Sequence, residues 1–253
     1  MTEPILQVSN LVKRFGGVLA TDHLDFDMWP GEIHAVIGPN GAGKTTFVSQ
    51  IAGMLRPDAG CIRFAGVDIT HVSAAARAQC GLARSFQITS IFPHFTALTN
   101  VALAVQAHSG HSFRFWRPAH KDLALVEPAY AMLDRLGLKE RANILAAHLA
   151  HGEQRQLDIA MALATHPKLL LLDEPTAGMG AAESQRMAAL LRSLKGRYSI
   201  LLIEHDMDTV FSLADRVTVL VYGQRLATGS PADIRHNAAV RAAYLGQEDD
   251  FRA

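Results

Sequence analysis

One stretch of the sequence has the residue types and spacing that suit phosphate binding. Residues 38–45 fit the pattern G-x-x-x-x-G-K-[S/T]. Glycines let such a loop curl so that its N–H groups point at phosphate oxygens, and a following helix adds its positive dipole end. We expect Lys44 to reach the β- and γ-phosphates of a nucleotide and the Thr45 hydroxyl to ligate Mg²⁺. The candidate nucleotide-binding residues here are Gly38, Pro39, Asn40, Gly41, Ala42, Gly43, Lys44, Thr45 and Thr46.

An apolar run that ends in two acids forms a second candidate site. Residues 169–172 are four leucines, typical of a central parallel strand covered on both faces, and Asp173 and Glu174 follow directly. We predict that Asp173 holds Mg²⁺, directly or through water, and that Glu174 acts as general base on the attacking water. The alternative is that the two acids simply cap a strand in solvent. This alternative becomes improbable once residues 38–45 are accepted as a phosphate-binding loop.

The hydrophobic pattern predicts the elements that position these sites. Residues 33–37 read as a buried strand entering the phosphate loop, and residues 45–52 as the helix that leaves it. Alternation over residues 5–14 and 21–28 predicts two strands of an antiparallel layer. Further predictions are helices over 125–136 and 187–194, a strand over 199–203, a hairpin of 217–222 with 224–227, a final helix capped by Ser230, and a loop or peripheral insertion over 109–120.

Composition and charge narrow the class of protein. The 253 residues are 49% hydrophobic, enough for a sizeable core, and 24 basic residues balance 24 acidic ones, which argues against a dedicated nucleic-acid binder. The N-terminus lacks a signal peptide and no apolar run approaches the roughly 18 residues of a membrane span. We therefore expect a cytoplasmic protein whose membrane role comes through a partner. Cys61 and Cys80 show no metal-ligand spacing and are predicted to be buried thiols.

The order of these motifs resembles the ATPase subunits of ABC transporters over nearly the whole chain. Residues 149–153 look like the family's signature motif at the start of a helix. The resemblance implies that this motif lies against the γ-phosphate held by the phosphate loop of a second ATPase subunit, attracted by a glycine backbone and a helix N-terminus. The signature residues acting on the partner in this way are Ala150, His151, Gly152 and Glu153.

Three further residues take roles from the same resemblance. Gln87 matches the glutamine that senses Mg²⁺ and the attacking water, and is thus both a catalytic and a metal candidate. His205 matches the histidine that contacts the γ-phosphate, and Phe15 matches the aromatic residue that stacks on adenine. Each match is weak alone, and their order relative to residues 38–45 and 173–174 carries the assignment.

The resemblance implies a fold, a domain plan and partners. The fold is α/β, with a P-loop NTPase (RecA-like) core, an N-terminal antiparallel β layer and a helical signature subdomain. One ABC ATPase domain, 1–253, divides into a layer and core (1–87 and 156–230), a helical subdomain (88–155) and a helical tail (231–253). ATP and Mg²⁺ are the cofactors. The implied partners are two membrane permeases, a second ATPase subunit (a copy or a homologue) and, indirectly, a periplasmic solute-binding protein, at the cytoplasmic side of the inner membrane.

Several stretches are most similar to the branched-chain amino acid importer ATPases, a group that also serves urea, amides and aromatic or organic acids. They are residues 14–17, 84–87, 202–207 and 243–246. Residues 88–101 are expected to form the groove for a cytoplasmic helix of the permease. The plainer interpretation is that their apolar side chains simply fill the helical subdomain.

Two departures from the family pattern leave alternatives open. Ala150 replaces the usual signature serine, as it does in branched-chain importer ATPases, and Gly180 stands where an aspartate is usual. A regulatory subunit that binds ATP without hydrolysis is one alternative, although Lys44 and Glu174 are retained. A soluble ABC ATPase of DNA repair or translation is another, but the chain has one cassette, no heptad run and no surplus of basic residues.

Overall fold

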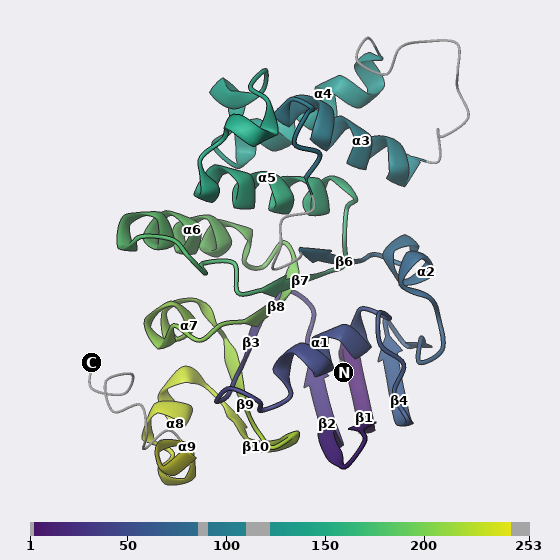
Figure 1. Ribbon diagram of the computed structural model, residues 1–253, viewed down its shortest axis with the longest axis vertical. Helices are drawn as coiled ribbons and strands as arrows, with labels where there is room; N and C mark the ends of the chain where they lie inside the picture. Colours follow the sequence, from purple (N-terminus) through teal and green to yellow (C-terminus); the bar gives the residue numbers. More distant parts are fainter. Residues whose placement is uncertain (1–2, 86–90, 110–121, 244–253) are drawn as a thin grey trace.

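The computed structural model describes residues 3–85, 91–109 and 122–243. Their helices and strands fall into layers, shown in Figure 1. The strands are β1 Leu6–Phe15, β2 Val18–Met28, β3 Ile33–Ile37, β4 Ala59–Phe64, β5 Val67–Asp68, β6 Leu82–Ser85, β7 Leu169–Asp173, β8 Ser199–Ile203, β9 Arg216–Val221 and β10 Gln224–Gly229. The helices are α1 Lys44–Ile51, α2 Ala74–Gln79, α3 Ala97–Ser109, α4 Leu123–Arg135, α5 His151–Ala164, α6 Ala181–Leu194, α7 Met207–Leu213, α8 Pro231–His236 and α9 Ala238–Ala243.

A six-stranded sheet forms the centre of the molecule, in the order β10-β9-β3-β8-β7-β6. Its inner strands are parallel: β3 pairs with β8 and β9, and β7 pairs with β8 and β6, while β10 is antiparallel to β9. Parallel strands end at the same edge, so the segments that follow β3, β7 and β8 meet there. Both candidate sites therefore lie at one edge of one sheet.

The four leucines of β7 show that both faces of this sheet are covered. Leu170 and Leu172 belong to a core shared with α3 to α7, whereas Leu169 and Leu171 belong to a core shared with α1 and the four-stranded sheet β2-β1-β4-β5. Side chains of a strand alternate between its faces, so an unbroken apolar run needs two apolar surroundings. The predicted central strand and the predicted antiparallel layer are both confirmed.

A buried arginine fastens α1 to the loop that enters α2. Arg77 is 1% exposed, and its guanidinium donates to the carbonyl oxygens of Gln50 (2.7 Å), Ile51 (2.6 Å) and Thr70 (3.0 Å). The last carbonyls of a helix have no partner within it, so Arg77 satisfies two of them at the end of α1. The helix that begins at the phosphate loop is thus anchored at its far end.

Helices α3, α4 and α5 pack together beyond the core sheet, at the top of Figure 1. Leu125, Ala129 and Leu133 form the buried face of α4, as their spacing predicts. Helix α5 is continuous over 151–164, so the predicted boundary between 155 and 156 falls inside it, and the division into core and subdomain stays a prediction. Most of the segment 109–120 lies outside the described residues.

The remaining predicted helices and strands are found, but the C-terminal helices and the two cysteines differ from the prediction. Ser230 caps α8 as predicted, but a second helix, α9, follows it within the described residues. The prediction of two buried thiols is wrong, because Cys80 is exposed at the end of α2 and Cys61 is half-buried on β4. On β4 the neighbouring Ile62 takes the inward position, which turns Cys61 outward. None of the helices described has the length and apolar character needed to cross a membrane.

Candidate nucleotide-hydrolysis site

Backbone from β2 in the four-stranded sheet and from β9 in the six-stranded sheet packs directly against the phosphate loop. Gly43 has a φ of 98°, and a Cβ placed on it would lie 2.1 Å from the carbonyl oxygen of Ala20 on β2. A Cβ on Gly38 would lie 2.2 Å from a carbonyl oxygen of β9. Gly223, between β9 and β10, donates its N–H to the carbonyl oxygen of Ala42 at 3.0 Å. Gly38 and Gly43 are therefore required by close packing as well as by the curl of the loop.

Lys44 begins α1 and folds its side chain back over the preceding loop. Its Nζ donates to the carbonyl oxygens of Gly38 (2.6 Å) and Pro39 (3.1 Å). Partial burial lowers the pKa of Lys44, and the charges of Glu174 and Asp173 act in the opposite direction. A cation is thus held between the phosphate loop and the acidic strand end, where it can meet a phosphate group.

The two acids after β7 have different surroundings. Asp173 has a 4% exposed side chain and accepts a bond from Arg84 Nη2 at 3.0 Å. Glu174 has a 27% exposed side chain and a left-handed backbone with φ of 48°, and its N–H donates to Ile203 on β8 at 2.9 Å. A non-glycine residue in this conformation is held there by its surroundings. Asp173 is paired with a cation, whereas Glu174 is accessible to water.

The loop after β8 brings His205 beside Glu174. The His205 Nδ1 lies 3.9 Å from the Glu174 Oε1, and the imidazole is 64% exposed. The preceding residue, Glu204, is fully buried and accepts bonds from both Thr176 and the backbone of His205. Burial raises the pKa of Glu204. The segments after β7 and β8 are therefore joined by one carboxylate.

The signature segment forms the start of α5. Ala150 is the N-cap and has no side-chain acceptor for the first helical N–H groups. Glu153 lies in the first turn, where it accepts from the Ala150 N–H at 3.0 Å and from Arg141 Nε at 2.8 Å. The helix start is stabilised by Glu153 instead of by a capping hydroxyl.

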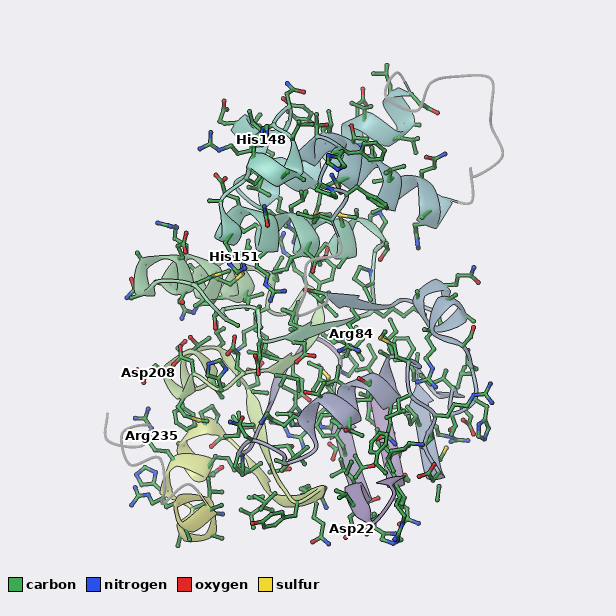
Figure 2. All side chains as sticks on the ribbon, in the orientation of Figure 1. Asp22, Arg84, His148, His151, Asp208 and Arg235 are labelled. Atoms are coloured by element: carbon green, nitrogen blue, oxygen red, sulfur yellow. The ribbon has the colours of Figure 1, made fainter. Side chains whose placement is uncertain are left out.

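In its own chain the signature segment faces α6 and not the phosphate loop. A Cβ on Gly152 would lie 3.4 Å from Glu183 Oε1, and one on Gly178 would lie 3.7 Å from His151 Cε1. His151, labelled in Figure 2, lies on the opposite side of the core sheet from α1, which is labelled in Figure 1. A small pocket between α5 and α6 is lined by Gly152, Glu153, Gln156, Met179, Glu183, Arg186 and Met187.

The structure brings some of the predicted site residues together and leaves others apart. The phosphate loop, the acid pair and His205 share one edge of the core sheet. Phe15 ends β1 with 51% of its surface exposed, and Lys13 Nζ lies 5.7 Å from its ring centre. An exposed ring is able to stack on a nucleobase. Gln87 lies outside the described residues.

Two buried polar contacts near the site were not predicted from the sequence. One is the Glu204 contact, and the other joins Ser85 Oγ, at the end of β6, to Asp158 Oδ2 on α5 at 2.7 Å. Arg84, labelled beside the core sheet in Figure 2, was also missed as the partner of Asp173. Glu204 had a signal in the sequence, since it ends an apolar strand in the same way as Asp173.

The donor set fits a nucleotide that carries Mg²⁺. Thr45 is exposed at the start of α1 and Asp173 supplies carboxylate oxygen, both hard ligands of the kind Mg²⁺ prefers. Among the described residues, no group of three or more His, Cys, Asp or Glu side chains gathers to hold a metal. Mg²⁺ is commonly held by one or two carboxylates together with substrate phosphates, which agrees with this arrangement.

Comparisons with known proteins agree with this geometry. Residues 21–177 match the family described as ABC transporter, and residues 224–250 match the one described as branched-chain amino acid ATP-binding cassette transporter. The chain is 39% identical to BraF of Pseudomonas aeruginosa, a high-affinity branched-chain amino acid transport ATP-binding protein, over 98% of this chain and 100% of that protein. It is 37% identical to Escherichia coli LivG, which has the same description, over 98% and 100%.

A solved structure gives the same result at the level of the fold. The ADP conformation of MJ1267, an ATP-binding cassette of an ABC transporter, superposes with a TM-score of 0.85 at 29% identity, covering 97% of this chain and 100% of that one. The P-loop NTPase fold is therefore confirmed. The chain belongs to the ABC transporter family, as one of its nucleotide-binding, ATP-hydrolysing subunits.

Proposed function

We propose that this chain hydrolyses ATP to drive an importer of branched-chain or related amino acids through separate membrane permeases. The observation that carries the proposal is the shared sheet edge, where Glu174 and His205 lie 3.9 Å apart at the edge that also carries the phosphate loop and Lys44. Full-length similarity to BraF and LivG and the match over residues 224–250 support the solute class. Urea, amides and aromatic or organic acids are the alternative solutes.

In the proposed reaction Glu174 accepts a proton from the water that attacks the γ-phosphate. The Lys44 ammonium and the loop N–H groups stabilise the charge that develops on the phosphate oxygens. Thr45 and Asp173 hold Mg²⁺, which neutralises phosphate charge when bound. Asp173 is buried against Arg84, while Glu174 is accessible to water, so the two acids take different roles.

Two substitutions test these roles because they remove activity for different reasons. Glu174→Gln keeps the shape of the side chain and the phosphate loop, so ATP still binds, but loss of the general base lowers the rate about 10²- to 10⁴-fold. Lys44→Ala removes the cation, so both ATP binding and hydrolysis fall. ATPase rates and fluorescent-nucleotide titrations measure both effects. A Glu174→Gln rate within about tenfold of the parent contradicts the general-base assignment.

The position of the signature segment supports a second ATPase subunit as partner. His151 and the start of α5 lie across the core sheet from α1, the helix that begins at the phosphate loop of the same chain. Each site is therefore completed by the signature of another copy or a homologue. Size-exclusion chromatography of the Glu174→Gln chain should show a dimer with ATP and Mg²⁺ and a monomer without. A monomer under both conditions at high protein concentration counts against a self-partner.

An exposed aromatic pair just before α3 suits a permease contact. Phe92 and Phe95 are 49% and 44% exposed, with ring centres 5.7 Å apart. Asn100, fully buried, accepts from the Phe92 N–H at 2.7 Å and donates to the Phe92 carbonyl at 3.1 Å, which holds the turn rigid. Val101 is buried, so part of the apolar content of 88–101 does fill the core. Ile88 lies outside the described residues.

Co-purification with the permeases tests this contact. Phe92→Glu and Phe95→Glu should each weaken recovery of the permeases from membranes while ATP binding survives. Val67→Glu is the matched control, because Val67 is 62% exposed on β5 in the other sheet. Recovery that is unchanged in both phenylalanine variants contradicts the docking assignment. The complex, reconstituted with its solute-binding protein, then identifies the solute as the compound that stimulates ATP hydrolysis.

A further inference from the structure

A buried carboxylate links the two loops that carry the candidate catalytic side chains. Glu204 follows β8 and has no exposed surface. Its Oε1 accepts from the N–H of Thr176 at 3.0 Å and from the Thr176 hydroxyl at 2.5 Å. Its Oε2 accepts from the N–H of His205 at 3.2 Å. Each carboxylate oxygen thus holds a different loop.

The two loops belong to neighbouring strands. Asp173 at the end of β7 pairs with Ile203 at the end of β8, and the Glu174 N–H donates to the Ile203 carbonyl at 2.9 Å. Beyond this pair the strands stop, and Glu204 continues the connection through its side chain. Thr176 lies two residues after Glu174 along the chain, so it belongs to the same turn.

A buried carboxylate is costly unless donors satisfy it, and apolar residues would fill the same space without that cost. Packing alone therefore does not explain why a glutamate is buried at position 204. Its donors are groups of the Glu174 turn and of the His205 loop, and His205 Nδ1 lies 3.8 Å from the Glu204 Oε2. A charged acceptor shared by two loops fixes their relative position, since each bond is charge-assisted and directional.

We propose that Glu204 is a positioning residue that holds the Glu174 turn and His205 in the single arrangement needed for ATP hydrolysis. The inference rests on the proposed roles of Glu174 and His205. Glu204 does not touch the nucleotide. Its contribution appears in the rate of the chemical step and not in the affinity for ATP, because the phosphate loop is held by other contacts.

Glutamine cannot replace this carboxylate. An amide has one acceptor oxygen, so if that oxygen faces Thr176, the NH₂ group meets the N–H of His205, and the reverse orientation opposes the Thr176 N–H. Either way one loop loses its acceptor and meets a second donor. Glu204→Gln is similar in volume and uncharged, so the substitution tests the connection with little change in packing.

The experiment measures kcat and KM for ATP with the purified full chain. Glu204→Gln should lower kcat about tenfold or more, since displacements of about 1 Å cost up to about 100-fold, while KM changes less than about twofold. Thr176→Val should give a smaller loss in kcat, and Thr176→Ser, which restores the hydroxyl, should recover most of it. Thr218→Val is the matched control: it removes a buried hydroxyl bonded to His34 on β3, away from both loops.

A double-mutant cycle separates positioning from general stability. If Glu204 acts through His205, Glu204→Gln combined with His205→Ala should lower kcat at least threefold less than the product of the two single losses. The inference is overturned if the loss in kcat of the double variant equals the product of the two single losses. It is also overturned if the kcat of Glu204→Gln lies within twofold of the parent. If Glu174→Gln remains active, the site assignment itself is wrong and the inference fails with it. A loss shared by Thr218→Val would assign the effect to stability and overturn the positioning role.

Discussion

Replacing Gly43 with alanine tests whether the backbone of β2 holds the phosphate loop in place. Gly43 has a φ of 98°, and the added Cβ would lie 2.1 Å from the Ala20 carbonyl oxygen. Carbon and oxygen normally approach to about 3.3 Å at closest. The loop and the strand must therefore separate by roughly 1 Å to accept the methyl group.

Replacing Gly41 in the same loop measures the part of the stability loss that comes from backbone conformation alone. Its φ is 80°, but a Cβ there would meet nothing within 4 Å. Gly41→Ala therefore carries only the left-handed backbone cost, about 1–2 kcal/mol. Gly43→Ala carries the same cost plus overpacking of about 1–3 kcal/mol. The expected loss of unfolding free energy is roughly 2–5 kcal/mol for Gly43→Ala against about 1–2 kcal/mol for Gly41→Ala.

Urea unfolding of the nucleotide-free chain measures this difference, because bound nucleotide would add its own stabilisation. The parent and both variants are compared at equal m-values. Equal unfolding free energies for Gly41→Ala and Gly43→Ala would refute the contact with β2. Gly43→Ala should also weaken binding of a fluorescent ATP analogue, since a loop displaced by about 1 Å no longer aims its N–H groups at phosphate.

Three further predictions concern stability. Ser85→Ala should lower the unfolding free energy by about 1–3 kcal/mol in urea, because buried Asp158 loses a donor. Arg77→Met should lower the thermal midpoint far more than the exposed control Arg225→Met, since it leaves buried carbonyls without donors. Burial lowers the pKa of His34 below 6.5, so its contribution to stability is present above pH 6.5 and is lost as the pH falls. His34→Gln should therefore flatten the decline in urea midpoint between roughly pH 7.5 and pH 5.5, and an unchanged slope would contradict this.

Several features of the protein are determined by short stretches of sequence. The phosphate loop was predicted because its glycines, Lys44 and Thr45 occupy one continuous segment. Residues 169–172 were recognised as a strand covered on both faces because every position is leucine. Ser230 was recognised as a cap because Pro231 follows it at the first helical position, and its hydroxyl accepts from the Asp233 N–H in the structure. Local geometry decides each of these features, so local sequence is sufficient to predict them.

Other features depend on which strands become neighbours. Glu204 and Thr176 are 28 residues apart, and Ser85 and Asp158 are 73 apart. In both pairs, nothing in the sequence around one residue indicates its partner. The pairing of β7 with β8 brings Thr176 to Glu204, and the packing of α5 against β6 brings Asp158 to Ser85, so both contacts follow from the packing of the whole chain.

Exposure was also decided by tertiary structure. Phe92 and Val101 belong to one apolar segment, yet Phe92 is 49% exposed while Val101 is fully buried. Cys80 was predicted to be buried from its neighbours and is exposed. Hydrophobicity along the chain shows that a segment is able to be buried, but the face that meets the core is chosen only when the other layers pack against it.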